Sequence, residues 1–291
     1  MIKIERKETP HTQEAMDDLQ EACDTGRSYN TEHVNQALQE VFHGKCYICE
    51  NKEATSYQIE HLIPHRGDKK LKYDWNNLFW VCAHCNNIKS DKYEPILNCT
   101  TEPVEHLIAF RKTGYFGTDE KLEFVPVKDD NVAIRNTILL LNDAYYGTTP
   151  QKKMEARIIR KMLRKDLSKF KEYVREYQEE ENEEEKENIA MLLKKELKDS
   201  SAFTAFKRWL ILHNEEFRSH GYVRIPNWFR HYIRNTKNWN YTVVNEYCNY
   251  YCNKCEMDYE QRRRYYKGYY TFEVSDDELL QLQRAEWIKQ K

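Results

Sequence analysis

Two Cys-x-x-Cys pairs, Cys46–Cys49 and Cys82–Cys85, constrain the fold of this 291-residue chain more than any other feature. Each pair can present two thiolates to one metal ion, and two pairs complete a tetrahedral four-cysteine zinc site. The chain has nine cysteines, an odd number that fits a disulfide framework poorly. We therefore predict that these four cysteines hold a structural Zn²⁺ that ties two distant segments together.

Composition indicates a polar, globular protein, with 32% charged and 40% hydrophobic residues. No apolar stretch approaches the roughly 18 to 20 residues that a membrane helix needs. The first residues also lack the apolar core of a secretory signal. We therefore expect a cytoplasmic protein with no membrane association. The net charge of −2 alone argues against a nucleic-acid partner, but it conceals strong local asymmetry.

Apolar periodicity divides the chain into four predicted regions. Residues 1–44 form a helical lead-in with helices at 13–24 and 31–42, and Gly44 follows as a stop signal. Residues 45–98 form the metal module, with strands at 57–61 and 78–82 and a helix starting at 86. Residues 99–200 contain a strand at 121–127, a helix at 134–141 and a long helical pattern from 152. Residues 201–291 are basic and rich in tyrosine.

The predicted fold class is mainly α with a small α+β module. Two strands, a metal-lined gap and a helix make a ββα unit, and such a unit is too small to be stable without its metal or a supporting body. We therefore expect a zinc-stapled ββα module embedded in a helical body.

Side chains suited to hydrolysis lie between and beside the cysteine pairs. Glu60 directly precedes His61, Asn77 precedes the second strand, and Asn86 follows the last cysteine. Histidine suits a general base because its pKa lies near neutrality. A neighbouring carboxylate can hold a cation that stabilises a phosphorane-like transition state. The arrangement indicates metal-assisted hydrolysis of phosphodiesters.

The full motif is Cys46-x-x-Cys49, Glu60-His61, Asn77-Leu78 and Cys82-x-x-Cys85-Asn86-x-x-Lys89. It resembles the HNH, or ββα-metal, endonucleases in their zinc-stapled form. The resemblance implies that His61 is the general base, that Glu60 is a metal ligand and that Asn77 braces the loop and orients the histidine. It also implies DNA as the substrate and products with 5′-phosphates.

Asn86 occupies the last position of that motif, where many members carry histidine. The resemblance assigns this position a ligand role beside Glu60. An amide oxygen there favours Mg²⁺ or Mn²⁺ over a second zinc as the catalytic ion.

A looser similarity extends over residues 1–165. It rests on Ile59-Glu60-His61, Tyr73-Asp-Trp-Asn-Asn-Leu78, the second cysteine pair and Thr137-Ile-Leu-Leu-Leu-Asn142. These segments resemble the HNH subunits of bacterial anti-phage systems, namely the PtuB-type nuclease of Septu and its retron-associated relatives. The resemblance implies an ABC-type ATPase partner in a hetero-oligomeric complex.

Other polar features leave alternatives open. Lys89 is predicted to bind substrate as a point charge on phosphate, and His65 to line the substrate cleft or help bind metal. His84 is expected to be surface-exposed. The segment 152–175 has ten Lys/Arg against three acids and is either a solvated helix face or a DNA-facing surface. The acidic run 179–187 is expected to be a solvated loop between two helices.

The carboxy-terminal region also has more than one interpretation. Cys248-x-x-x-Cys252-x-x-Cys255 has the spacing of radical-SAM enzymes, but only 36 residues follow it. Buried cysteines on a helix face are favoured over a second zinc site that borrows His231. The basic, tyrosine-rich composition suits either nucleic-acid binding or a protein interface.

The sequence therefore predicts a metal-dependent HNH endonuclease that hydrolyses DNA, as the nuclease subunit of an anti-phage complex. One alternative is a non-catalytic zinc-binding subunit for protein interactions. The other is a stand-alone restriction-type HNH nuclease.

Overall fold

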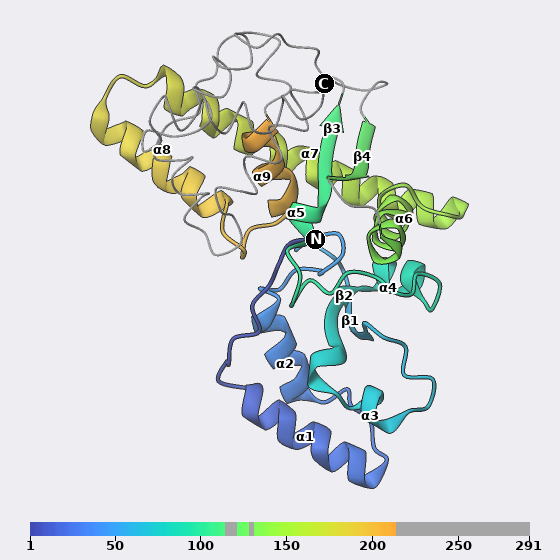
Figure 1. Cartoon of the computed structure of the whole chain (residues 1–291). Helices are drawn as coiled ribbons and strands as arrows, with labels where there is room; N and C mark the ends of the chain where they lie inside the picture. The colour runs from blue at the N-terminus through green and yellow to red at the C-terminus, as the bar shows by residue number, and fades with distance from the viewer. Residues whose placement is uncertain (114–120, 128–130, 214–291) are drawn as a thin grey trace, which may run out of the picture.

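A computed structural model describes residues 1–113, 121–127 and 131–213 as mainly helical with two small antiparallel sheets (Figure 1). The first sheet pairs β1 (Tyr57–His61) with β2 (Leu78–Cys82). The second pairs β3 (Ile108–Thr113) with β4 (Lys121–Pro126). The predicted fold class, mainly α with a small zinc-stapled α+β module, is confirmed.

The lead-in consists of two packed helices, α1 (Thr12–Thr25) and α2 (Glu32–Val41). Helix α1 ends at Gly26, which adopts a positive φ of 76° and donates its N–H to the carbonyl of Ala22. Helix α2 begins after Thr31, whose hydroxyl accepts the N–H of Val34. Both predicted helices are confirmed to within one residue at each end.

The metal module follows as a ββα unit. Helix α4 (Ala83–Lys89) packs against both β1 and β2. The loop between the strands carries the short helix α3 (Lys69–Lys72) and a 3₁₀ turn, η1 (Trp75–Asn77). Both strands have their predicted bounds. The helix predicted to start at Asn86 begins three residues earlier, because Cys82 already takes the extended conformation of a cap residue. Cys85 therefore lies within the helix.

A second body of the molecule covers the module. Helix α5 (Val104–Leu107) leads into β3, helix α6 (Val132–Tyr146) packs on β4, and α9 (Thr204–His213) packs on β3. Four aromatic rings meet at this junction at centroid distances of 5.3 to 5.9 Å. They belong to Phe110, Phe124, Tyr145 and Phe206. The predicted strand at 121–127 and helix at 134–141 are confirmed, and β3 is an addition.

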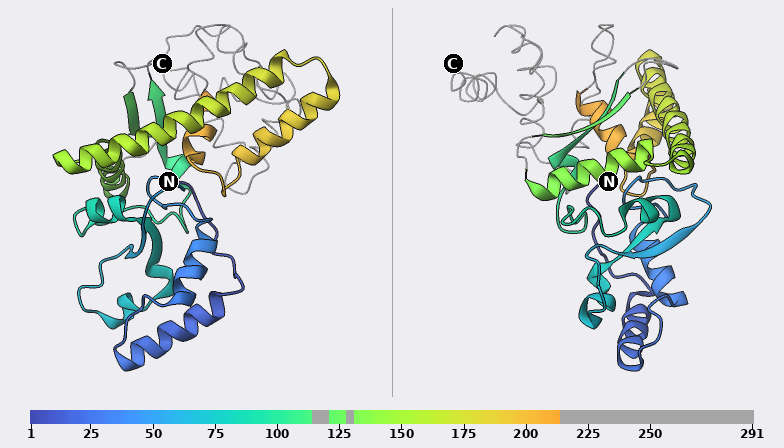
Figure 2. Two further views of the ribbon diagram at one scale, coloured as in Figure 1. Left: turned by 180° about the vertical axis from the view of Figure 1, so that it is seen from behind. Right: turned by 90° about the vertical axis from the view of Figure 1, so that its right-hand side faces the viewer.

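The long helical pattern forms an antiparallel pair, α7 (Pro150–Glu179) and α8 (Glu183–Glu196) (Figure 2). The acidic run was predicted to be a loop, which is wrong for most of its length. Only residues 180–182 separate the helices, and the Asn182 side chain accepts the N–H groups of Glu184 and Glu185. Acids in a first helical turn are stabilised by the helix dipole, which here outweighs the repulsion between like charges.

A buried ion cluster joins the module to this second body. Glu50 follows the first cysteine pair and accepts the Met1 ammonium at 2.5 Å and Lys45 Nζ at 3.4 Å. Lys45 Nζ also donates to the carbonyl of Ser201, and Glu50 accepts the N–H of Ala205. Because these groups are 0–1% exposed, the charges are compensated within the protein.

Within the described ranges, no helix is long and apolar enough to cross a membrane. The predicted region boundaries at 44, 98 and 200 stay predictions. The Cys248–Cys252–Cys255 cluster, His231 and most of the basic tail lie outside the described residues.

Candidate active site

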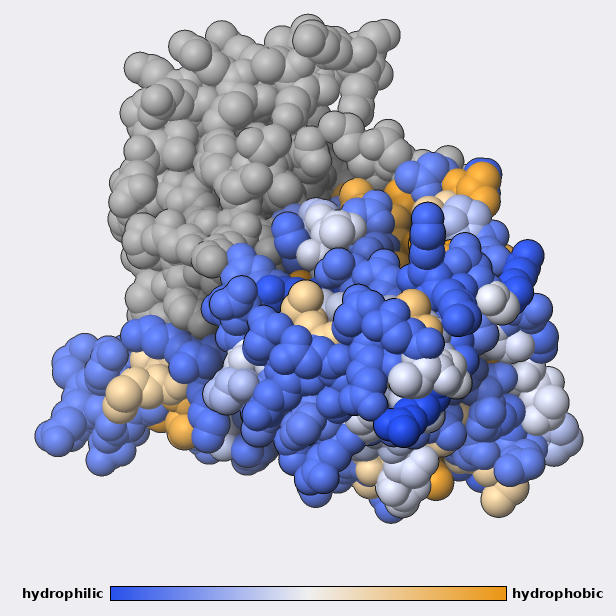
Figure 3. Space-filling model, turned by 90° about the horizontal axis from the view of Figure 1, so that it is seen from below, coloured by the Kyte–Doolittle hydropathy of each residue, from blue (hydrophilic) through white to orange (hydrophobic). Residues whose placement is uncertain are grey.

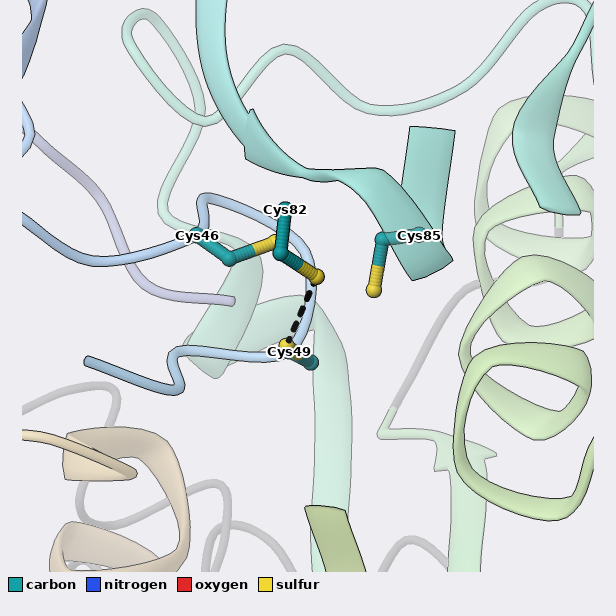
Figure 4. Close-up of side chains that lie close together, drawn as sticks. All are labelled: Cys46, Cys49, Cys82 and Cys85. Atoms are coloured by element: carbon teal, nitrogen blue, oxygen red, sulfur yellow. Dashed lines mark hydrogen bonds between the residues drawn. The ribbon is translucent and has the colours of Figure 1, made fainter. Parts of the chain in front are cut away.

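The four cysteines converge as predicted, and their sulfur atoms lie within 4.8 Å of one another in a fully buried position (Figure 4). Cys46 and Cys49 come from the loop after α2, Cys82 ends β2 and Cys85 lies in α4. A tetrahedral zinc with Zn–S bonds of about 2.3 Å has sulfur–sulfur edges of about 3.8 Å. The Sγ atoms of Cys49 and Cys82 are 3.9 Å apart, so the cluster has the size of a zinc site.

Protonation of the cluster also points to a cation. Burial opposes charge on Cys46, but the three neighbouring thiols donate to its sulfur and lower its pKa well below the ordinary range. The hydrogen bond with Cys46 raises the pKa of Cys49. Burial and the hydrogen bonds with the other three cysteines raise the pKa of Cys85. Without a metal, the site therefore favours charge on Cys46 over charge on Cys49 or Cys85. A Zn²⁺ ion removes this limit by compensating all four thiolates, so the donor set fits structural zinc.

The pleat of β1 sends its polar side chains in two directions. Gln58 and Glu60 share the face toward α4, while Ile59 and His61 share the other face. The strand pairs with β2 so that His61 lies opposite Leu78. Glu60 and His61 are therefore adjacent in sequence but belong to different surroundings.

His61 is held by one hydrogen bond and two aromatic neighbours. Its Nε2 lies 2.9 Å from the carbonyl oxygen of Lys72. A carbonyl can only accept, so Nε2 carries the proton and the lone pair of neutral imidazole is on Nδ1. The rings of Tyr29 and His65 meet the imidazole edge-on at centroid distances of 4.8 and 4.7 Å. Burial lowers the pKa of His61 below its usual 6.5, which favours the neutral base at pH 7.

Asn77 braces the loop that provides this carbonyl. Its Oδ1 accepts the N–H of Ile63, and its Nδ2 donates to the carbonyls of Ile63 and Leu71, all at 2.8 to 3.0 Å. The side chain is buried, and its amide pairs with three peptide groups of the loop. Leu71 directly precedes Lys72. Asn77 therefore fixes the backbone that orients His61 without touching the imidazole.

Glu60 is buried in an ion pair on the α4 side of the strand. Its Oε1 contacts the ammonium of Lys89, and its Oε2 accepts the hydroxyl proton of Tyr47 at 2.5 Å. Lys89 also donates to the carbonyl of His61 at 3.1 Å. Burial raises the pKa of Glu60, and the contacts with Lys89 and Tyr47 oppose that rise.

Asn86 lies at the edge of the same interface. Its Nδ2 donates to Oε1 of Gln58 at 2.7 Å, which leaves the amide oxygen of Asn86 as an available acceptor. Glu60, Gln58 and Asn86 thus bring carboxylate and amide oxygens to the interface of β1 and α4. Oxygen donors of this kind suit Mg²⁺ or Mn²⁺.

A catalytic cation nevertheless does not fit this arrangement as it stands. The Lys89 ammonium occupies the position against Oε1 of Glu60 that a cation would need. Among the described residues, the four cysteines are the only group of three or more His, Cys, Asp or Glu close enough to hold a metal. The residues fit structural zinc, while Glu60 here serves as half of an ion pair.

The structure also places three further polar residues that the sequence analysis singled out. Lys89 was predicted to contact phosphate, but its side chain is 2% exposed and faces Glu60. His84 was expected at the surface, whereas it is 9% exposed and bridges Glu155 and the carbonyl of Ala144. His65 lies against His61, and its Nδ1 accepts the N–H of Gly67. A role for His65 in lining a substrate cleft or binding metal stays a prediction.

Sequence reasoning missed several contributors. Tyr29, which contacts His61, comes from the connection between α1 and α2. The loop between β1 and β2 holds this connection, because the Tyr73 hydroxyl donates a hydrogen bond to the carbonyl of Arg27. Lys72 orients His61 through its backbone carbonyl, so the identity of its side chain does not indicate this role. Gln58 could have been found, because it precedes Glu60 by two residues and so shares its face of the strand.

The outer surface around the lead-in and the nuclease module is mainly hydrophilic, with apolar residues in small separate patches (Figure 3). Large apolar patches mark protein or membrane contacts more often than nucleic-acid contacts. This end of the described molecule is therefore compatible with a polar substrate.

Comparison with known families agrees with the geometry. Residues 46–92 match the family model described as HNH endonuclease. No curated protein and no solved structure gives a significant match to the chain. The chain thus carries an HNH endonuclease domain, which belongs to a family of phosphodiester hydrolases, with a four-cysteine cluster suited to zinc.

Proposed function

We propose that the protein is a metal-dependent endonuclease that hydrolyses phosphodiester bonds of DNA, with His61 as the general base. The observation that carries this proposal is the hydrogen bond from Nε2 of His61 to the Lys72 carbonyl. It fixes the tautomer and leaves Nδ1 as a proton acceptor, as a base that activates water requires. The match of residues 46–92 to HNH endonucleases supports DNA as the substrate.

The reaction needs one proton acceptor beside the attacking water. Nδ1 of His61 takes a proton from water while the water oxygen forms a bond to phosphorus. The bond from phosphorus to the 3′-oxygen breaks, which leaves a 5′-phosphate and a 3′-hydroxyl after the leaving oxygen gains a proton from solvent. Asn77 contributes by positioning, because it holds the loop whose carbonyl fixes the imidazole.

HNH nucleases generally use a divalent metal, and we include Mg²⁺ or Mn²⁺ in the proposal, with Glu60 and Asn86 as its oxygen ligands. Such an ion, when bound, neutralises charge on the transition state and the leaving oxygen. Binding it would require Lys89 to give up its contact with Glu60. Zn²⁺ in the cysteine cluster would keep β2 and α4 in place.

A plasmid-nicking assay with Mg²⁺ or Mn²⁺ tests the proposal. We expect His61→Ala to lower the cleavage rate by a factor of about 10² to 10⁴, the range that general bases contribute. His33→Ala is a matched control, because His33 is 44% exposed on α2. Zinc content and the denaturation midpoint should equal those of the wild type in both variants. Undiminished cleavage by His61→Ala would refute the assignment.

EDTA should abolish cleavage in the same assay, and zinc must be measured afterwards. Loss of activity with the zinc retained indicates a separate catalytic cation. Loss of both indicates only that the module needs its zinc. A zinc-loaded wild-type protein that binds DNA without ever cleaving it would favour the non-catalytic alternative.

We further propose that the nuclease works in the cytoplasm as a subunit of an anti-phage complex with an ABC-type ATPase. The support is the sequence similarity of residues 1–165 to PtuB-type subunits. In the structure, Thr137 of that similarity is buried and bonds to Leu97 and Ala133, so it serves the fold. Affinity purification from the native host tests the complex. Recovery of the nuclease without an ATPase would argue for a stand-alone enzyme.

A further inference from the structure

Helix α7 carries a continuous row of basic residues on one face. Seven positions spaced three or four residues apart define this basic stripe: Lys153, Arg157, Arg160, Arg164, Ser168, Lys171 and Arg175. Six of the seven are Lys or Arg, and none is acidic. Because such spacing keeps side chains on one side of a helix, their charges accumulate along a single line.

Two of the three acids between Lys153 and Arg175 make contacts away from the stripe, and the third, Glu172, neutralises the stripe's last residue, Arg175. Glu155 contacts His84 of α4 and Lys152, and Asp166 contacts the buried Lys207 of α9 at 2.6 Å. Glu172 lies 3.6 Å from Arg175, at the far end of the stripe. The acids near the beginning and middle of α7 therefore serve the packing, and the stripe keeps a net positive charge.

This concentration has an energetic cost within the chain. Like charges four residues apart on a helix destabilise it by roughly 0.2 to 0.5 kcal/mol per pair. A merely solvated helix face usually mixes both signs along its length. The stripe lacks that mixture over its first six positions, of which Lys153, Arg157 and Arg164 are exposed, while Arg160 donates to the carbonyl of Tyr145 and Arg175 pairs with Glu172. A polyanion is the ligand that such a surface fits.

The dimensions match a duplex. The 22 residue steps from Lys153 to Arg175 extend over about 33 Å at 1.5 Å per residue, close to one turn of B-DNA at about 34 Å. Duplex DNA presents a regular series of negative charges over such a length, whereas an acidic protein surface has no reason to do so.

The stripe also begins beside the nuclease module. The amino-terminal part of α7 packs on α4, the helix that carries Asn86, through the ion pair of His84 and Glu155 at 2.6 Å. The stripe extends from there along α7 to the turn before α8, as Figure 1 shows for the helix. It lies outside residues 46–92, the part of the chain that matches the HNH family.

We propose that the basic stripe of α7 binds the phosphate backbone of duplex DNA outside the cleavage site. The choice of DNA as the polyanion rests on the proposed function. The stripe would hold the duplex without reading its sequence, because its side chains are charged and arranged on one straight helix face. Its contribution should depend strongly on salt and little on base sequence.

The test is the binding of a 30-bp duplex to the full chain in the His61→Ala background. Fluorescence anisotropy measures this binding at several salt concentrations. The stripe variant combines Lys153→Gln, Arg157→Gln and Arg164→Gln. The control variant removes the same charge at exposed positions elsewhere, with Lys7→Gln, Lys195→Gln and Lys198→Gln. Circular dichroism checks that both variants keep their helices.

We expect the stripe variant to bind about tenfold more weakly or worse near 0.1 M salt, with the slope of log K against log salt reduced by about 2 to 3. The control variant should bind like its parent. Equal slopes for the two variants would overturn the proposal, as would tighter binding of polyglutamate than of a duplex at equal charge. Because His61→Ala is used throughout, a loss of duplex binding specific to the stripe stands even if the wild type never cleaves DNA.

Discussion

Replacement of Lys89 by methionine tests the central electrostatic feature of the site. Lys89 and Glu60 form an ion pair with side chains 2% and 7% exposed, so neither charge has water to replace its partner. Methionine keeps most of the volume of the lysine stem and removes only the ammonium. The variant therefore leaves a carboxylate buried with a single remaining donor, the hydroxyl of Tyr47.

The expected effect follows from the burial. Breaking a buried ion pair by removal of one partner costs about 3 to 5 kcal/mol, because the other charge stays desolvated. Native domains are stable by only about 5 to 15 kcal/mol, so Lys89→Met should remove a large part of that stability. The double variant Glu60→Gln/Lys89→Met should recover most of the loss, since no net charge then remains buried.

The measurement is urea denaturation of the zinc-loaded protein at pH 7. The midpoint and slope of the transition are compared among Lys89→Met, Glu60→Gln and the double variant. Arg66→Met provides a control, because Arg66 pairs with Glu94 at a similar distance, 2.9 Å, but is 69% exposed. A surface pair contributes about 1 kcal/mol or less. If Lys89→Met costs no more than Arg66→Met, the buried ion pair does not exist in solution.

Three other changes separate the roles of neighbouring residues. Cys46→Ser should lose zinc and unfold the module, as seen by metal analysis and circular dichroism, because three thiolates no longer close the tetrahedron; retained zinc and structure would contradict this. Asn77→Ala should cost about 1 to 3 kcal/mol of unfolding free energy in urea denaturation, since loop groups lose their hydrogen-bond partners. It should also lower kcat more than it raises KM, because His61 loses its orientation. An unchanged kcat would refute the positioning role. Burial alone would raise the pKa of Glu50, but the Met1 ammonium and Lys45 lower it to about 2, below its usual 4.5. The pair should therefore stabilise the fold above pH 4.5, and the difference in unfolding free energy between wild type and Glu50→Gln, on the order of 3 kcal/mol, should shrink as pH falls from 4.5 toward 2; a constant difference would contradict the shift.

The sequence was sufficient for the parts of the site whose pattern is local. The bounds of β1 and β2 were predicted to the residue. The zinc cluster follows from spacing alone. Strand β3 was missed because its apolar first half ends in Arg111, Lys112 and Thr113, which resemble a surface loop. Its partner β4 lies beyond a connection that offers no periodic signal.

The sequence gives little information on a side chain whose environment depends on a distant element. Lys89 resembles a surface lysine at the end of a helix, and only the packing of α4 on β1 shows that it faces a buried carboxylate. His84 likewise becomes structural because α6 and α7 cover it. Tyr29 reaches the base from another part of the chain. No spacing rule connects such residues, since the contacts arise from tertiary structure.

Helix α4 couples the cysteine cluster to strand β1, which carries His61, the proposed base. Cys85 and Lys89 are four residues apart, so both lie on the buried face of the helix, one toward the sulfur cluster and the other toward Glu60. Asn86 is one residue further round than Cys85 and lies at the partly exposed edge, against Gln58. Any movement of the helix that follows loss of zinc must therefore displace Lys89 and Asn86 together. For this reason Cys85→Ser should impair both stability and DNA cleavage, whereas His61→Ala should impair cleavage alone.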